Sequence, residues 1–382
     1  MFEYKISKQS KISKARIGIF TTPHGEIETP VFMPVGSVGA VKTMSPRDLK
    51  AVGAQTVLAN TYHLYLRPGA RLIKKIGGLH EFTKFNGPIL TDSGGYQVFS
   101  LSEGKRRKSS NQKIKSAEIT ENGVNFYSHL DGSKHFIAPE DSIKIQEGLG
   151  ADIIMAFDEC PSVSDKSKTK SAMERTHRWL LRCLKAKHKL NQALFPICQG
   201  GAFKDLRVQS AKFINSLNLP GSAIGGVSVG ESKEKIYQVA DWCTDILDIN
   251  KPRYLMGIGY PEDIVEAVTR GIDMFDCVLP TRLARHKIAW VKSKKRSAVK
   301  LRGLGYGYVQ IDLSHLRYKA DESVLDSSCD CYTCNAGFSK AYLRHLMGED
   351  EPLGIHLLTL HNLKFTFDLI DAIKSKIIAG KF

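Results

Sequence analysis

The sequence predicts an α/β fold built as a (β/α)₈ barrel, and two observations support this. Eight short apolar runs, each stopping at a polar residue or a glycine, alternate with helical patterns along the chain. Such runs are typical of parallel strands that are buried on both faces. The chain has 382 residues, 42% of them hydrophobic, which is enough for one large barrel. A doubly wound sheet is the alternative, since periodicity cannot count strands around a closed barrel.

The eight predicted strands share one arrangement, an apolar run and the residue that ends it. In chain order they span residues 31–33, 56–59, 89–91, 153–157, 194–198, 222–224, 254–256 and 274–275. In a barrel of this kind the active site lies at the carboxyl ends of the strands. We therefore expect five strand-end residues to converge there: Asp92, Asp158, Gln199, Gly226 and Asp276.

Helical patterns lie between these runs. Residues 45–48 form a capping box with proline in the first turn. Further helices are expected over residues 139–149, 168–190, 204–217, 232–247 and 261–269. The last of them has Glu262 and Asp263 in its first turn and Gly271 after its end, as the helix dipole favours.

Two stretches do not fit the repeat of one single barrel domain over residues 1–382. Residues 100–138 are too many for a simple loop, and they contain a basic run at 105–108 and a hairpin-like pattern at 123–127. We interpret them as an insertion after strand three, with a basic lip. Residues 302–363 form a second, small module around three clustered cysteines.

The amino-acid composition indicates which kind of partner the protein binds and in which cellular compartment it functions. The formal net charge of +16 favours a polyanionic partner, although a generally basic proteome would give the same charge. No apolar run is long enough for a transmembrane helix, and the basic N-terminus lacks the apolar region of a secretory signal. Five scattered cysteines and one cluster suit a reducing cytoplasm and a metal site better than a disulfide framework.

The cysteine cluster predicts a metal site. Cys329, Cys331 and Cys334 place three thiolates on a tight knuckle, and His345 or His361 could supply the fourth corner of a tetrahedron. A closed Cys₃His set is a structural zinc site with no open position for a substrate. Three free thiols in a loop are the alternative, but clustered exposed thiols are reactive.

The acidic strand ends admit two interpretations each. Asp276 follows the buried pair 274–275, where a carboxylate is costly unless it is paired, hydrogen-bonded or used in chemistry. It could equally cap the next turn. Asp92 could be an acid, a base or a turn cap, and Tyr96 after it could stack on a planar ligand or pack against the protein.

A second group of strand-end residues suits the edge of a purine-like base. Asp158 offers an acceptor carboxylate, Gln199 an amide with a donor and an acceptor, and Gly226 exposed backbone groups. Each of them alone is explained by turn chemistry. Their shared position at strand ends favours a common site.

Several longer motifs resemble the bacterial tRNA-guanine transglycosylases, also called queuine tRNA-ribosyltransferases. These motifs are residues 60–64 (NTYHL), 92–98 (DSGGYQV), 155–160 (MAFDEC), 225–231 (GGVSVGE) and 275–282 (FDCVLPTR), together with the Cys-x-Cys-x₂-Cys knuckle and its later histidine. The resemblance covers residues 13–370, nearly the whole chain.

This resemblance implies a zinc-bearing barrel that replaces guanine at the wobble position of GUN anticodons (Asp, Asn, His and Tyr tRNAs) with a 7-deazaguanine. The incoming base would be preQ1, with queuine as the alternative, and the reaction would pass through a covalent ribosyl-enzyme. Asp276 matches the nucleophile of the family and Asp92 its general acid/base. The base-binding residues would be Asp92, Ser93, Gly94, Gly95, Tyr96, Asp158, Gln199 and Gly226.

The resemblance also implies partners. Two segments match those that contact the tRNA anticodon loop: Gly257, Ile258, Gly259, Tyr260, Pro261, Glu262, Asp263, and Thr281, Arg282, Leu283, Ala284, Arg285. The family pattern His-Asn-Leu selects His361 over His345 as the fourth zinc ligand. It further implies a cytoplasmic homodimer without a membrane partner.

Some residues depart from the family pattern. Leu283 and Ala284 stand where a small polar residue and glycine are usual, Val227 replaces a leucine of the base pocket, and Cys198 replaces a valine. These departures leave open the choice between preQ1 and queuine. Three other functions also stay open at this point: a noncatalytic tRNA-binding paralogue, a glycoside hydrolase of the same fold, and a zinc hydrolase.

Overall fold

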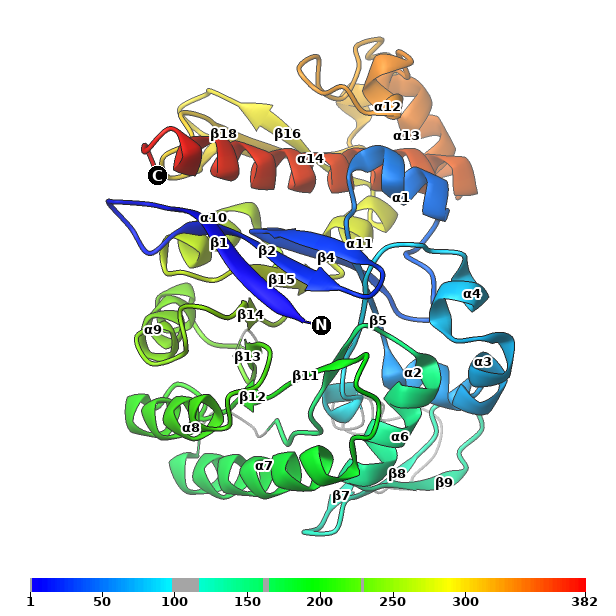
Figure 1. Ribbon diagram of the computed structural model, residues 1–382. Helices are drawn as coiled ribbons and strands as arrows, with labels where there is room; N and C mark the ends of the chain where they lie inside the picture. Colours follow the sequence, from blue (N-terminus) through cyan, green and yellow to red (C-terminus); the bar gives the residue numbers. More distant parts are fainter. Residues whose placement is uncertain (1, 98–116, 161–164, 228–229) are drawn as a thin grey trace.

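The computed structural model describes residues 2–97, 117–160, 165–227 and 230–382, and it confirms the barrel (Figure 1). The basic run at 105–108 and residues 228–229 of the motif 225–231 lie outside the described residues. Nine parallel strand segments form one sheet in the order β11-β10-β6-β5-β4-β15-β14-β13-β12. They are β4 (Val31–Gly36), β5 (Val57–Ala59), β6 (Ile89–Thr91), β10 (Ile153–Met155), β11 (Ala193–Phe195), β12 (Ile197–Cys198), β13 (Ser222–Ile224), β14 (Arg253–Leu255) and β15 (Met274–Cys277).

The nine segments make eight strand positions because β11 and β12 are two halves of one strand. Pro196 separates them, and proline has no N–H to donate to a ladder. The β11 half pairs with β10 and the β12 half pairs with β13, so the barrel closes at this strand. The backbone oxygens of Phe195 and Pro196 still accept hydrogen bonds from Ala156 and Ala223, at 3.0 and 2.8 Å. All eight predicted strands are therefore confirmed.

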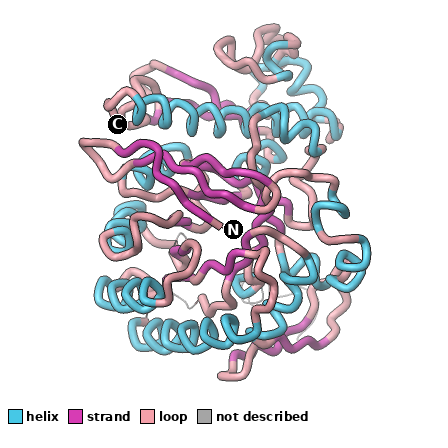
Figure 2. The backbone as a smooth tube through the Cα atoms, viewed as in Figure 1, coloured by secondary structure: helices cyan, strands magenta, loops and turns pink. Residues whose placement is uncertain are grey.

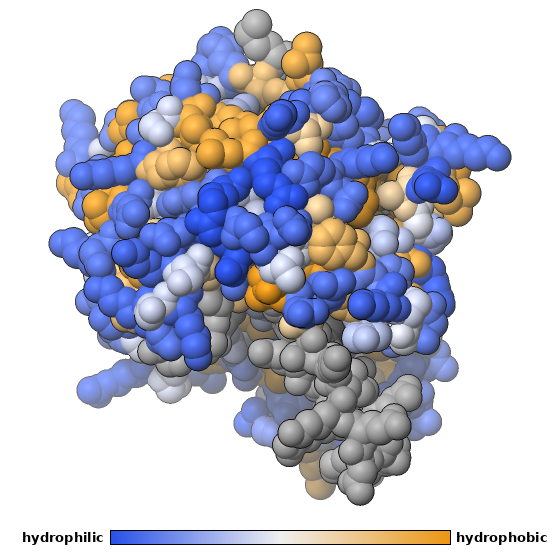
Figure 3. Space-filling view, turned by 90° about the horizontal axis from the view of Figure 1, so that it is seen from below, coloured by the Kyte–Doolittle hydropathy of each residue, from blue (hydrophilic) through white to orange (hydrophobic). Residues whose placement is uncertain are grey.

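Helices surround the strands, as Figure 2 shows in the same view. The predicted helices are confirmed with small shifts at their ends, as α1 (Pro46–Val52), α6 (Pro139–Leu149), α7 (Lys166–Ala186), α8 (Lys204–Ser216), α9 (Lys233–Thr244) and α10 (Pro261–Thr269). Within the described part of the barrel, four more helices were not expected from the sequence: α2 (Thr61–Leu66), α3 (Ala70–Ile76), α4 (Leu79–Thr83) and α11 (Leu279–Arg285). Seen from below, the side on which α7 and β7 lie in Figure 1, the described surface is mainly hydrophilic with apolar patches between (Figure 3).

An N-terminal antiparallel sheet closes the amino ends of the barrel strands. It consists of β1 (Glu3–Gln9), β2 (Arg16–Thr22) and β3 (Gly25–Thr29), and the sequence did not predict it. Tyr4, Phe20 and Ile27 of this sheet join the cluster of apolar side chains inside the barrel. Arg16 forms a buried, two-pronged ion pair with Asp273 just before β15, with N–O distances of 2.9 and 2.6 Å.

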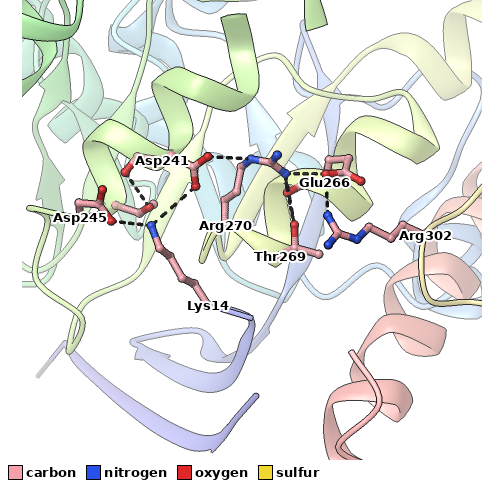
Figure 4. Close-up of polar contacts among 8 residues, drawn as sticks. Lys14, Asp241, Asp245, Glu266, Thr269, Arg270 and Arg302 are labelled. Carbon is pink, nitrogen blue, oxygen red and sulfur yellow. Dashed lines mark hydrogen bonds and ion pairs between the residues drawn. The ribbon is translucent and has the colours of Figure 1, made fainter. Parts of the chain in front are cut away.

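A surface network ties this sheet to the outer helices (Figure 4). Lys14 lies 2.5 Å from Asp245 of the segment after α9, and Arg270 joins Asp241 of α9 to Glu266 of α10 at 3.1 and 2.6 Å. Arg302 reaches Glu266 at 3.5 Å. Exposed pairs of this kind each contribute about 0–1 kcal/mol, so they orient the elements more than they stabilise them.

The insertion and the C-terminal region each contain a small sheet, and the C-terminal sheet begins at residue 288, before the predicted start of that module at 302. The described part of the insertion holds β7 (Glu118–Ile119), β8 (Val124–Tyr127) and β9 (Lys134–Ile137), which pair antiparallel and confirm the hairpin pattern. The C-terminal region holds β16 (Ile288–Ser293), β17 (Val299–Lys300), β18 (Gly307–Asp312), η1 (Leu316–Tyr318), α12 (Tyr332–Asn335) and α13 (Lys340–Gly348). The long helix α14 (Pro352–Ile378) begins there, runs past residue 363 and packs on α11, β16 and β4. Within the described part of the chain, no helix is both long and apolar enough to cross a membrane.

Candidate active site and metal site

Polar side chains converge at the carboxyl ends of the barrel strands, as the sequence predicted. Asp92 follows β6, Asp158 follows β10, Gln199 follows β12, and Asp276 belongs to β15. Asp158 links two of these strand ends directly, because it accepts hydrogen bonds from Ser93 Oγ at 2.9 Å and from Gln199 Nε2 at 2.7 Å. The arrangement is a mouth that holds three carboxyl groups.

Asp276 is held by one of its two oxygens. Its Oδ1 accepts a hydrogen bond from the Tyr254 hydroxyl at 2.6 Å and from the Gly257 N–H at 2.8 Å. Burial raises the pKa of Asp276, and these two hydrogen bonds act in the opposite direction. Both bonds use Oδ1, so Oδ2 is available for chemistry with a bound molecule.

Asp92 is more deeply buried and is held from the neighbouring strand β5. Its Oδ1 accepts from the Thr61 N–H at 2.7 Å, and its Oδ2 accepts from the Asn60 side-chain amide. Burial raises the pKa of Asp92 to about 7, and the charges of Asp276 and Asp158 contribute in the same direction. A carboxyl group with such a pKa can both give and take a proton near neutral pH.

The proposed base pocket is shaped by close backbone packing. Burial raises the pKa of Asp158 to about 6, while its hydrogen bonds to Ser93 and Gln199 lower it. Gly226 has a φ of +61°, and a Cβ there would lie 2.1 Å from Oε1 of Gln199. That oxygen is buried and has no hydrogen-bond partner among the described residues. It is an acceptor that a ligand could use.

The glycines after Asp92 serve a backbone contact. A Cβ on Gly95 would lie 2.6 Å from the backbone oxygen of Asp158, so glycine allows the two loops to touch. Gly94 has a φ of +79° and packs near the backbone of Tyr62. Tyr96 follows with 48% of its surface exposed, so its ring is accessible at the mouth.

Arg207 of α8 connects two loops of this pocket, and the sequence gave no reason to single it out. The side chain is 0% exposed. Its guanidinium donates to the backbone oxygens of Gly201 at 2.7 Å, Cys198 at 2.6 Å and Gly226 at 3.0 Å. The planar guanidinium group of Arg207 therefore fixes the backbone on both sides of Gln199 and at Gly226.

The two segments expected to contact tRNA differ in what they expose. Arg282 is exposed on α11, Arg285 is partly buried beside it, and Tyr260 is 40% exposed. Ala284 is buried in the apolar cluster of the C-terminal module, and Leu283 packs on the barrel core.

Other side chains of these segments are already engaged within the protein. Glu262 binds Lys233 at 2.5 Å and the Tyr308 hydroxyl at 2.7 Å, and Asp263 accepts from the Tyr237 hydroxyl at 2.6 Å. Exposed tRNA contacts would thus fall mainly on Tyr260, Arg282 and Arg285.

A second cluster lies in the C-terminal module. The Sγ atoms of Cys329, Cys331 and Cys334 and a nitrogen of His361 all lie within 4.8 Å of one another and could hold a metal ion. His361 Nδ1 faces Cys331 at 3.7 Å and Cys334 at 3.3 Å, and its Nε2 lies 2.7 Å from the Trp290 backbone oxygen. A hydrogen bond from Nε2–H to that oxygen leaves the lone pair of Nδ1 for a metal. His345, the other histidine that spacing allowed, is exposed and not part of the cluster.

Sequence reasoning did not assign Tyr254, Asn60 or Arg207 to the site. Asn60 and Tyr254 were seen only as part of a motif or a strand, yet they hold the two catalytic candidates Asp92 and Asp276. A tyrosine one strand away from a strand-end carboxylate is the signal that could have been used for Tyr254.

Comparison with known proteins agrees with this geometry. The family model described as queuine tRNA-ribosyltransferase matches residues 10–382. Three proteins named queuine tRNA-ribosyltransferase are similar over nearly their whole length. The one from Herpetosiphon aurantiacus is 50% identical over 97% of this chain and 87% of its own. The one from Desulforamulus reducens is 50% identical over 98% and 94%, and the one from Halothermothrix orenii is 51% identical over 96% and 91%. The chain therefore belongs to the queuine tRNA-ribosyltransferase family.

Proposed function

We propose that this enzyme exchanges guanine at the wobble position of GUN anticodons for a 7-deazaguanine, in the biosynthesis of queuosine. Family membership supports the reaction class. The observation that carries the proposal is the state of Asp276. It is a strand-end carboxylate that the described residues hold through Oδ1, in a mouth that also holds a second carboxyl group, Asp92, with a pKa of about 7.

Asp276 and Asp92 have distinct roles in this proposal. An oxygen of Asp276 attacks C1′ of the wobble ribose, the bond from C1′ to guanine breaks, and Asp92 donates a proton to the leaving base. The incoming base then gives a proton to Asp92 and attacks C1′, which releases Asp276. Two inversions give net retention, as in retaining glycosidases.

The base would lie between Tyr96 and the strand ends. Guanine and 7-deazaguanines carry N–H groups on one edge, and the carboxylate of Asp158 can accept hydrogen bonds from these groups. The Gln199 amide and the backbone of Gly226 supply further polar partners, while Ser93, Gly94 and Gly95 allow close approach. Stacking of Tyr96 on the base would keep water away from the ribosyl-enzyme, which hydrolysis would otherwise destroy.

The tRNA would reach this mouth through its anticodon loop. Bases of a single-stranded loop can be turned outward into a pocket, which a paired base resists. Residues 257–263 and 281–285 flank the mouth, and Arg282 and Arg285 would bind phosphates. The net charge of +16 fits this partner. We further propose a homodimer, as the family resemblance implies.

The Cys₃His cluster is proposed to hold one structural Zn²⁺. Cys329, Cys331, Cys334 and His361 are soft ligands in a closed tetrahedral set, which leaves no position for a substrate. The ion would tie the knuckle around α12 to α14. Its proposed role is stability of the module, without a part in base exchange.

The proposed physiological base is preQ1. The resemblance supports this choice, because Cys160 matches a pocket that is narrow beside the 7-substituent. Val227, which is buried beside Gly226, acts in the opposite direction, because valine is one methylene smaller than the usual leucine and leaves room for a larger base. Such a difference discriminates by about 1–3 kcal/mol, so some use of queuine is compatible with it. Competition between the two bases at equal concentration tests this choice, and exclusive incorporation of queuine would contradict it.

The exchange of radiolabelled guanine into tRNA tests the function itself. The wild type should incorporate label and, with an unreactive base analogue, should form an enzyme–tRNA adduct that survives a denaturing gel. Asp276→Asn keeps the shape of the side chain and should still bind tRNA, while exchange falls by several orders of magnitude and the adduct disappears. Binding without exchange in the wild type would favour the noncatalytic paralogue. An adduct in Asp276→Asn that maps to Asp92 would reverse the two roles.

A further inference from the structure

Three metal-binding side chains meet at the amino ends of the barrel strands, at the opposite end from the carboxylates of the mouth. His24 lies in the turn between β2 and β3, His80 in α4, and Asp152 directly before β10. The backbone of Asp152 marks this end of the barrel, because it bonds to Ile89 at the start of β6 and to Ala193 at the start of β11. Residues 24, 80 and 152 are far apart in sequence and belong to three separate segments.

The three side chains are close enough to share one ion. His24 Nδ1 lies 2.7 Å from Asp152 Oδ1, and His80 Nε2 lies 3.2 Å from Asp152 Oδ2. The ligand atoms of the cluster all lie within 4.8 Å of one another. The two imidazole rings stack with their centroids 3.5 Å apart and an angle of 14° between the planes. Both rings therefore face the same carboxylate from the same side.

The buried carboxylate of Asp152 makes a positive charge in this cluster favourable. The Asp152 side chain is 0% exposed and that of His80 is 11% exposed, whereas that of His24 is 40% exposed. Asp152 also accepts hydrogen bonds from the backbone N–H groups of Ile89 and His24, at 2.9 and 3.2 Å. These N–H donors are neutral, so they do not balance the negative charge of the buried carboxylate. A cation between the carboxylate and the imidazoles would balance it.

His80 shows that hydrogen bonding does not fully satisfy the cluster. Its Nε2 is buried and makes no hydrogen bond of acceptable geometry to any residue in the described part of the chain, although Asp152 Oδ2 is 3.2 Å away. The stacking of the two rings at 3.5 Å disfavours a positive charge on both histidines. A metal ion bound between the two nitrogens and the carboxylate would give His80 Nε2 the partner that it lacks.

We propose that His24, His80 and Asp152 form a second metal site, distinct from the Cys₃His cluster, for a divalent transition-metal ion such as Zn²⁺. Two imidazoles and one carboxylate are a donor set that suits this class of ion, and a set of three leaves a position for water. The open position lies on the side of His24, the exposed member. A bound ion would spread the stacked rings, which the exposed turn carrying His24 can accommodate.

The site would hold the N-terminal sheet onto the barrel. His24 belongs to the turn that joins β2 to β3, while His80 and Asp152 belong to the barrel and its helices. Binding at this site stabilises the closed amino end and takes no part in base exchange. Metal binding at this site can therefore be measured through metal content and thermal stability, independently of the base-exchange activity.

Metal titration of the full-length protein tests the proposal. The protein is first prepared with one equivalent of zinc, and Zn²⁺ is then added at a pH of about 7.5, since metal binding requires neutral imidazoles. The wild type should take up a second equivalent and should unfold at a higher temperature with it. His24→Ala should lower the affinity for the second zinc ion by more than about 100-fold. Loss of a residue that only supports a metal ligand already lowers metal affinity by about 10- to 100-fold.

His188→Ala is the matched control, because His188 is also exposed and lies in the segment after α7. That variant should still bind two equivalents of zinc, and its unfolding temperature should still rise when the second equivalent binds. His24 is a surface residue, so its substitution should leave the fold and the first zinc in place. The proposal is overturned if the wild type binds only one equivalent at millimolar Zn²⁺, or if His24→Ala binds the second equivalent as tightly as the wild type does.

Discussion

The hydroxyl of Tyr254 donates a hydrogen bond of 2.6 Å to Oδ1 of Asp276, the same oxygen that accepts from the Gly257 N–H. Tyr254 lies on β14 and is 0% exposed, so its hydroxyl is fixed by the barrel itself. The hydrogen bond favours the ionised form of Asp276 and fixes the orientation of its carboxylate. Tyr254 thus acts on the reaction through Asp276.

Tyr254→Phe should slow base exchange without abolishing it. A hydrogen bond to a charged group is worth about 1.5–3 kcal/mol, which corresponds to about 10- to 100-fold in rate. Loss of this bond should also raise the pKa of Asp276, so the acidic limb of the pH–rate profile should move upward. Tyr4→Phe removes a hydrogen bond from a tyrosine hydroxyl to Asp273, at the opposite end of the barrel, and serves as the control. Equal effects of the two variants on the rate would contradict the assignment.

The pH dependence of adduct formation should report Asp92. Its pKa is raised to about 7, and the first step needs the protonated form to release guanine. Above pH 7 the rate should therefore fall by about tenfold per pH unit, as an alkaline limb separate from the acidic limb that Asp276 sets. Asp92→Asn should be slow throughout and should lack this alkaline limb. A wild-type rate that is level up to pH 9 would show that Asp92 is not the acid.

The barrel could be predicted from the sequence because its strands are buried on both faces. Runs such as 153–157 are apolar at every position, and each stops at the residue that faces the mouth. The N-terminal sheet could not be predicted in this way. In β1 only Tyr4 is buried, so the strand has the composition of a basic, solvated tail. The strand is fixed by tertiary contacts, among them the Tyr4 hydroxyl to Asp273 at 3.1 Å.

The sequence alone predicted those site residues that lie at the ends of the apolar runs, and it did not predict the others. Asp92, Asp158 and Asp276 were found because each directly follows or ends an apolar run. Arg207 was missed because it is one of several basic residues on an amphipathic helix, where exposure is the usual outcome. The choice of His361 over His345 came from the family pattern, since spacing alone left both histidines possible. The structure brings His361 to the three sulfurs.

The two histidines provide a direct test of the zinc site. His361→Ala should lose zinc and destabilise the module around α12 and α14, because it removes one of four ligands. His345→Ala should keep full zinc content, since His345 is exposed on α13 and outside the cluster. Metal analysis of the purified variants checks both outcomes. Full zinc occupancy in both His361→Ala and Cys331→Ala would refute the ligand set.

Binding of tRNA should depend on salt through the arginines of α11. For a single-stranded loop, log K should fall with log salt at about −0.7 per phosphate contact. Arg282→Ala and Arg285→Ala should weaken tRNA binding and make this slope shallower, while binding of the free base is unchanged. Lys84→Ala is a suitable control, because Lys84 is 75% exposed and follows α4 at the other end of the barrel. A tRNA affinity that is insensitive to salt would count against this interface.

Arg207 should position the base pocket. Its three hydrogen bonds hold the backbone oxygens of Gly201, Cys198 and Gly226, and a lysine cannot reach all three with one ammonium group. In Arg207→Lys at least one buried carbonyl loses its donor, at a cost of about 1–3 kcal/mol. The loops around Gln199 should loosen, and the KM for the incoming base should rise by about 10- to 100-fold.

The same variant should leave tRNA binding unchanged, because Arg282 and Arg285 are remote from α8. Arg182→Lys provides the comparison. Arg182 also holds several oxygens, those of Glu121, Asn122 and Glu140, but it lies between α7 and the β7–β8 turn. It should therefore lower stability without a change in the KM for the base. If Arg207→Lys lowers only the stability, or raises the KM for tRNA as much as that for the base, Arg207 supports the fold in general and does not position the pocket.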